Sequence, residues 1–174
     1  MRKFKYPVII LILVLALGSC RKIEQLSPKP HIEFTSFTVF DTVDILGNSA
    51  KGGRLRLYFE DGDGDLGLEV PSGNQTDTTN MFLTLFRKTG ENRVQATDND
   101  PLKPSPYRIP YMERLGQNKI LKGTISVTFL YTFYDPRDSD IISYDLFIKD
   151  RAENKSNIVS TCEIPLSVNG IYKN

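Results

Sequence analysis

The densest group of chemically capable side chains is the acidic segment from Glu60 to Gly67, which reads Glu-Asp-Gly-Asp-Gly-Asp-Leu-Gly. Carboxylates packed this closely repel one another, while glycines let the backbone wrap and expose its carbonyl groups. A flexible, oxygen-rich and acidic loop is what a hard cation such as Ca²⁺ requires, with about 6–8 oxygen ligands. We therefore identify Asp61, Asp63 and Asp65 as candidate metal ligands and Glu60 as a further candidate.

An EF-hand does not account for this segment. Aligning the three aspartates with the first, third and fifth loop positions places Leu66 where glycine is required and Ser72 where glutamate is required. A strand pattern also precedes the loop, where an EF-hand needs a helix. The other interpretation is a series of solvated turns, because Asp-Gly pairs also form turns.

The elements that position this loop are predicted to be strands. Apolar residues alternate with polar ones, and β-branched and aromatic side chains are frequent, whereas no segment shows helical periodicity. Pro106 and Pro110 restrict the fourth segment to an edge strand or an irregular stretch, and a bulge is expected at Thr35-Ser36. The pattern predicts an all-β, seven-stranded antiparallel sandwich. The expected strands cover residues 32–39, 54–59, 81–87, 107–112, 124–133, 142–148 and 158–166.

This order of strands predicts that two distant loops meet. Residues 60–80 connect the second and third strands, and Asp150 begins the connection between the sixth and seventh. In an immunoglobulin-type sandwich these two loops lie at the same end. We expect Asp150 to join Asp61, Asp63 and Asp65 around one ion, with Glu69 and Asn154 as further candidates. The arrangement resembles the loop-end calcium sites of cadherin-like modules, without their linker motifs.

Residues 144–157, which run from Tyr144 into Asp150-Arg151-Ala152-Glu153-Asn154-Lys155-Ser156-Asn157, carry a second resemblance. They resemble the sixth strand and following loop of bacterial immunoglobulin-like and fibronectin type III modules, where an alternating strand leads into Asp-x-Ala-Gly-Asn-x-Ser. Glu153 stands where glycine is usual, which affects the geometry of the turn. The resemblance implies a fold and carries no function.

The first twenty residues have the pattern of an export signal. Basic residues at positions 2, 3 and 5 precede an apolar run at 8–17, which is too short to span a bilayer. The following Leu17-Gly18-Ser19-Cys20 resembles the lipobox of bacterial lipoproteins. That resemblance implies cleavage before Cys20, diacylglycerol on its sulfur and acylation of the new amine. Arg21, in place of the aspartate that retains such proteins in the inner membrane, favours the outer membrane.

These patterns divide the chain into residues 1–19 as a signal peptide, 20–30 as a lipidated cysteine with an extended tether, and 31–174 as the sandwich. A formal net charge of +1 excludes a strong basic field for nucleic acid. The single histidine, His31, lies at the end of the tether, so we expect no catalytic histidine arrangement. Cys162 is expected to be a small core residue. The second acidic run, residues 135–140, is expected to be a solvated turn.

Three functions are consistent with the sequence. The first is a non-enzymatic lipoprotein, held at the membrane by Cys20, that serves as an interaction or assembly module with structural Ca²⁺ and an unidentified envelope partner. The second is a glycan-binding lipoprotein of a nutrient-uptake system, which would need exposed aromatic side chains. The third is a hydrolase that uses loop carboxylates about 5–10 Å apart in a pocket. The aromatic residues considered for the second are Tyr107, Tyr111, Tyr131, Phe133 and Tyr134.

Overall fold

The computed structural model describes residues 26–72, 79–113, 119–135 and 141–174, so the signal segment and Cys20 lie outside the described residues. Within these ranges the chain is all-β, and no helix is long and apolar enough to cross a bilayer. The strands are β1 (His31–Val43), β2 (Ser49–Asp61), β3 (Met81–Thr89), β4 (Asn92–Gln95), β5 (Leu121–Tyr131), β6 (Ile141–Ile148), β7 (Val159–Ser160), β8 (Ile164–Pro165) and β9 (Gly170–Tyr172).

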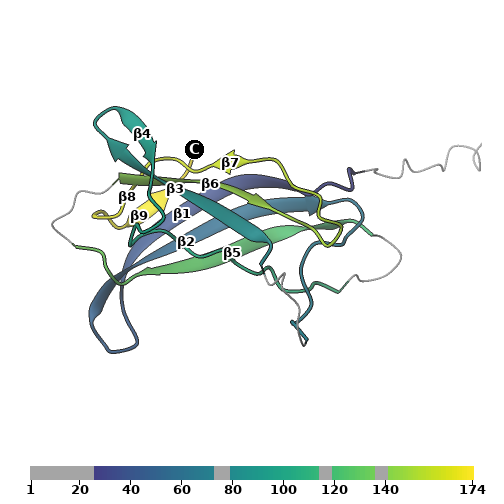
Figure 1. Ribbon diagram of the computed structural model, residues 1–174, viewed down its shortest axis with the longest axis horizontal. Coiled ribbons are helices and arrows are strands. Elements are labelled where there is room, and N and C mark those ends of the chain that lie inside the picture. Colours follow the sequence, from purple (N-terminus) through teal and green to yellow (C-terminus); the bar gives the residue numbers. More distant parts are fainter. Residues whose placement is uncertain (1–25, 73–78, 114–118, 136–140) are drawn as a thin grey trace, which may run out of the picture.

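The strands form two antiparallel sheets packed as a sandwich (Figure 1). One sheet has the order β5-β2-β1-β9, and the other has the order β4-β3-β6-β7, with β8 also paired to β6. The first, second and fifth strands therefore share one sheet, while the third and sixth share the other, as in an immunoglobulin-type sandwich. The predicted class of fold is confirmed.

Alternation along the strands explains the core. In β2, Leu55 and Leu57 face inward and are fully buried, while Arg54 and Arg56, which alternate with them, are exposed. The predicted bulge is present, because the register of β1 against β2 shifts between Phe34 and Ser36. Aromatic rings fill the centre between the sheets, where Phe37, Phe129 and Tyr144 stack with centroids 5.7–6.0 Å apart.

The fourth segment takes the irregular form, one of the two outcomes expected for it, and a different strand lies beside β3. Residues 107–112 are irregular and form only isolated bridges, from Tyr107 to Met81 and from Pro110 to Leu68. Proline lacks the N–H that a ladder needs, which is consistent with this outcome. The strand beside β3 is β4, which lies between the expected strands at 81–87 and 107–112, where no strand was predicted. All four of its residues are exposed, so no apolar alternation marks it in the sequence.

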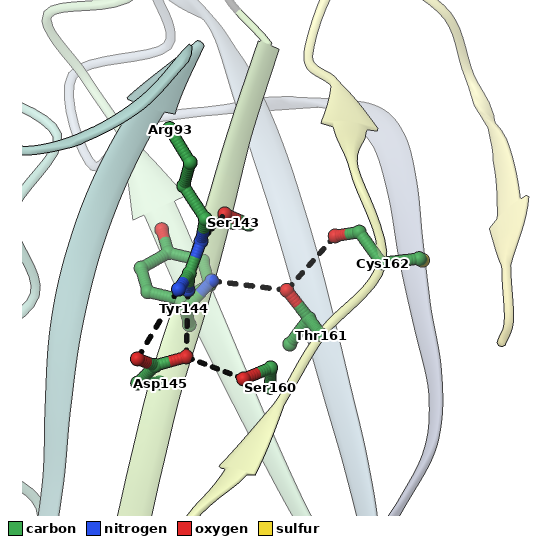
Figure 2. A network of polar contacts seen from close by, with 7 residues as sticks. All are labelled: Arg93, Ser143, Tyr144, Asp145, Ser160, Thr161 and Cys162. Carbon is green, nitrogen blue, oxygen red and sulfur yellow. Dashed lines mark hydrogen bonds and ion pairs between the residues drawn. The ribbon is translucent and has the colours of Figure 1, made fainter.

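The last predicted strand, residues 158–166, is divided into β7 and β8. Between them, Thr161 turns its hydroxyl oxygen to accept a hydrogen bond from the Tyr144 amide at 3.0 Å (Figure 2). The amide of Thr161 still donates to the Tyr144 carbonyl at 2.9 Å. This side-chain bond takes the place of a regular ladder bond. The chain then reaches the opposite sheet, where β9 pairs with β1.

A polar network ties the short strands to the centre of their sheet (Figure 2). Arg93 of β4 donates to Asp145 at 2.6 Å and to Ser143 at 2.8 Å, and it stacks on the ring of Phe86. Ser160 of β7 donates to the same carboxylate at 2.6 Å. Partial burial by itself would raise the pKa of Asp145, but these hydrogen bonds and the guanidinium charge hold it below its ordinary value. The network therefore fastens both edges of the sheet to β6.

Candidate functional site

Four aspartates converge at one end of the sandwich. Asp61 is the last residue of β2, Asp63 and Asp65 follow in the next loop, and Asp150 lies two residues beyond β6. Each contributes a carboxylate oxygen, and these oxygens all lie within 4.8 Å of one another. The convergence predicted from the strand order is therefore present, and the group could hold a metal cation.

The acidic loop is folded around the Asp61 carboxylate. Its Oδ2 accepts a hydrogen bond from the Leu66 amide at 2.8 Å, and both residues are fully buried. Between them, Gly64 has a φ of 67°, a left-handed conformation that glycine adopts at little cost. The buried Leu66 side chain anchors the loop to the core, which keeps the carboxylates of Asp63 and Asp65 turned back towards Asp61.

The Asp150 carboxylate is held by its own loop. It is 1% exposed, and its two oxygens accept hydrogen bonds from Asn154, one from the backbone amide at 2.8 Å and one from the side-chain nitrogen at 2.9 Å. Asn154 therefore positions the carboxylate of Asp150, while the predicted role of its side chain as a metal ligand stays a prediction.

The turn after Asp150 forces a glutamate into a left-handed conformation. Glu153 has a φ of 64°, at the position where the modules that residues 144–157 resemble carry glycine. A side chain with a Cβ pays about 1–2 kcal/mol in this conformation. We expect Glu153→Gly to raise the free energy of unfolding by about 1 kcal/mol, less the small contribution of the exposed ion pair with Lys149. Urea unfolding measures this, and Glu153→Ala, which keeps the Cβ, should give no gain.

Three contacts join the two acidic loops directly. The backbone amide of Arg151 donates to the Asp65 carbonyl at 3.3 Å, and the Ala152 amide donates to the Asp65 carboxylate at 3.2 Å. The Arg151 guanidinium reaches across to the Gly67 carbonyl at 2.9 Å. The sequence does not predict these contacts of Arg151 and Ala152, because a basic residue next to Asp150 gives no indication of which backbone carbonyl it will contact. They hold the two halves of the cluster in register.

At least two of the four converging carboxylates have a buried oxygen without a hydrogen-bond donor. Asp61 Oδ1 and Asp65 Oδ1 are buried and have no hydrogen-bond donor. Burial, followed by the neighbouring acids, raises the pKa of Asp61 to about 6. Burial and the charges of Asp150 and Asp63 raise the pKa of Asp65 as well. A cation among them would satisfy the orphaned oxygens and remove the repulsion.

The raised pKa of Asp61 predicts a pH dependence of stability. Because the folded state holds this proton above the ordinary pKa of 3.8, the free energy of unfolding should fall as pH rises from about 4 to 7. We expect this decrease, on the order of 2 kcal/mol, in chelator-treated wild type. Denaturation curves of wild type and Asp61→Asn, compared at each pH, isolate it. A difference between the two that is flat with pH would contradict the prediction.

Two of the further candidate ligands lie away from the cluster. Glu60 alternates with Asp61 along β2 and therefore faces outward, where it accepts a hydrogen bond from Tyr58 and pairs with Lys122 at 3.2 Å. Glu69 is exposed further along the loop, outside the group of converging oxygens. The strand period thus separates Glu60 from Asp61, although the two are adjacent in sequence.

Two of the five aromatic residues considered for sugar stacking, Tyr107 and Tyr131, pack against or within the core. Tyr131 is 4% exposed, and its hydroxyl is hydrogen-bonded to that of Tyr144 at 2.8 Å inside the core. Tyr107 packs edge-to-face against Phe129, whereas Phe133 is 77% exposed.

Most of the second acidic run, residues 136–140, lies outside the described residues.

Cys162 is half-buried against the core, as expected for a small apolar residue. Burial raises the pKa of its thiol, which favours the unreactive protonated form.

No family model, curated protein or solved structure was found to match the chain.

Proposed function

We propose that this chain is a non-enzymatic lipoprotein of the cell envelope whose immunoglobulin-like domain binds Ca²⁺ structurally and acts as an interaction or assembly module. The resemblance of residues 17–20 to a lipobox supports a lipid anchor at Cys20. Arg21 after the cysteine supports the outer membrane as the location of that anchor. Several buried acyl chains, at about 0.8 kcal/mol per CH₂, would make such an anchor firm.

The observation that carries the calcium proposal is the buried, unsatisfied oxygen of Asp61 within a group of four carboxylates. A fully buried carboxylate whose pKa is raised is costly unless a cation compensates it. Ca²⁺ suits an all-oxygen site with irregular geometry, whereas Mg²⁺ demands a near-octahedral arrangement and retains its waters. Zn²⁺ usually takes nitrogen and sulfur ligands, which this group does not offer.

Thermal unfolding with added calcium tests the proposal. Extracytoplasmic modules have dissociation constants of about 10⁻⁴–10⁻³ M. About 10 mM CaCl₂ should then stabilise the folded state by about 1.4–2.7 kcal/mol and raise Tm by about 4–10 °C relative to chelator. Equal MgCl₂ should raise Tm less. A Tm that does not respond to calcium would refute the proposal.

A further inference from the structure

Residues 26–30, the first part of the chain that the structure describes, lie at the end of the sandwich where the four aspartates converge. Residues 26–30 precede β1, whose first residues lie at the same end as the loop after β2 and the loop after β6 (Figure 1). The Gly62 amide donates a hydrogen bond to the Ser27 carbonyl at 3.0 Å. Gly62 stands between Asp61 and Asp63 in the sequence, so the residue that contacts the tether is flanked by two of the converging carboxylates.

Gly62 fits the tether by close approach of backbone to backbone. A Cβ at this position would lie 2.4 Å from the Ser27 carbonyl oxygen and 2.5 Å from that of Leu26. Its φ lies outside the left-handed region, so glycine is needed here for space and not for conformation. An alanine could therefore keep the path of the loop but could not keep the tether in place.

The loop after β6, which presents Asp150, holds the start of β1, directly after residues 26–30. The side-chain amide of Asn157 accepts a hydrogen bond from the Ile32 amide and donates one to the Ile32 carbonyl, both at 2.8 Å. Asn157 belongs to the loop that presents Asp150. The two loops that meet at the carboxylates are thus also the two that hold the tether and the start of β1.

We propose that cation binding docks residues 26–30 onto Gly62 and so controls how far the domain stands from its anchor. This inference rests on the proposed calcium site. Without the ion, repulsion among Asp61, Asp63 and Asp65 loosens the loop that carries Gly62. With the ion, the loop is fixed and the tether is held. Docking leaves six residues, 20–25, to reach the lipid, about 20 Å at most, compared with about 36 Å for residues 20–30 when undocked.

Hydrogen exchange of the full chain in detergent micelles, in CaCl₂ and in chelator, tests the proposal. In wild type, calcium should slow amide exchange in peptides covering residues 26–30 and 60–66 by about tenfold, a typical coupling between two sites. In Gly62→Ala, calcium should still raise Tm, but residues 26–30 should exchange fast in both conditions, while the Ile32 amide stays protected by its bond to Asn157. Gly170→Ala, whose added Cβ makes only ordinary contacts, should respond like wild type.

The outcomes separate this proposal from the calcium site itself. If calcium raises Tm but leaves exchange of residues 26–30 unchanged, docking is not coupled to the ion, although the calcium site stands. If Gly62→Ala retains the calcium-dependent protection, the docking contact is wrong. If calcium changes neither Tm nor exchange, both proposals fail.

Discussion

Asp61→Asn is expected to weaken calcium binding about 100-fold, or by about 2.7 kcal/mol, while making the calcium-free domain more stable at neutral pH. Asparagine keeps the volume of the side chain and an oxygen that can accept the hydrogen bond of the Leu66 amide. It removes the charge that burial and the neighbouring acids oppose, so the calcium-free protein gains stability. The opposite signs of the two effects distinguish a metal ligand from a residue that only supports the fold.

Calcium titration by calorimetry measures the affinity, and urea unfolding in chelator measures the stability. Glu69→Gln is the matched control, because it removes a carboxylate from the same loop but outside the converging group. It should change the affinity by less than about threefold, a difference of under 1 kcal/mol. Equal losses for the two variants would mean that calcium senses only the overall charge of the loop.

Phe37→Ala is expected to cost about 3–5 kcal/mol of unfolding free energy. The ring is fully buried at the centre of the sandwich, 5.8 Å from the ring of Phe129 and 6.0 Å from that of Tyr144. It also fills the space that Gly53 leaves, since a Cβ there would lie 2.5 Å from the Phe37 ring. A loss of this size is a large part of the stability of an ordinary domain, about 5–15 kcal/mol.

Phe40→Ala provides the comparison for Phe37→Ala within the same strand. Phe40 is only partly buried, and its ring packs beside the Arg54 guanidinium on the outer face. Its removal should cost about 1 kcal/mol. Urea unfolding of both variants in chelator gives the two values. Similar costs would contradict the assignment of Phe37 to the inner face and Phe40 to the outer face.

The sequence is most informative where apolar residues alternate regularly along a strand and where the order of strands determines which loops are neighbours. Alternation across Leu55 and Leu57 predicts β2, and the order of strands is enough to bring Asp150 to the three aspartates of the acidic loop. The sequence is least informative where exposure removes the pattern. All four residues of β4 are exposed, so no apolar alternation marks this strand, and the ladder between β7 and β8 is interrupted where the Thr161 hydroxyl accepts a hydrogen bond from the Tyr144 amide.

Part of the candidate site could likewise be predicted from the sequence, and part could not. Spacing predicts which carboxylates converge, because loop ends are fixed by the topology. The alternation of Leu55, Leu57 and Phe59 already implies that Asp61 faces inward and Glu60 outward, a signal that the choice of Glu60 as a candidate ligand did not use. No comparable pattern predicts that the Arg151 guanidinium reaches the Gly67 carbonyl. The contact between Gly62 and Ser27 depends on a close approach of two backbones, for which a glycine in an Asp-Gly repeat gives no separate signal.

Diffraction from crystals grown with calcium, at a wavelength where the ion scatters anomalously, would locate the ion itself. We expect one anomalous peak per chain, about 2.3–2.6 Å from carboxylate oxygens of Asp61, Asp63, Asp65 and Asp150. A map without a peak at this group, or with the Asp150 carboxylate turned away from the other three, would contradict it.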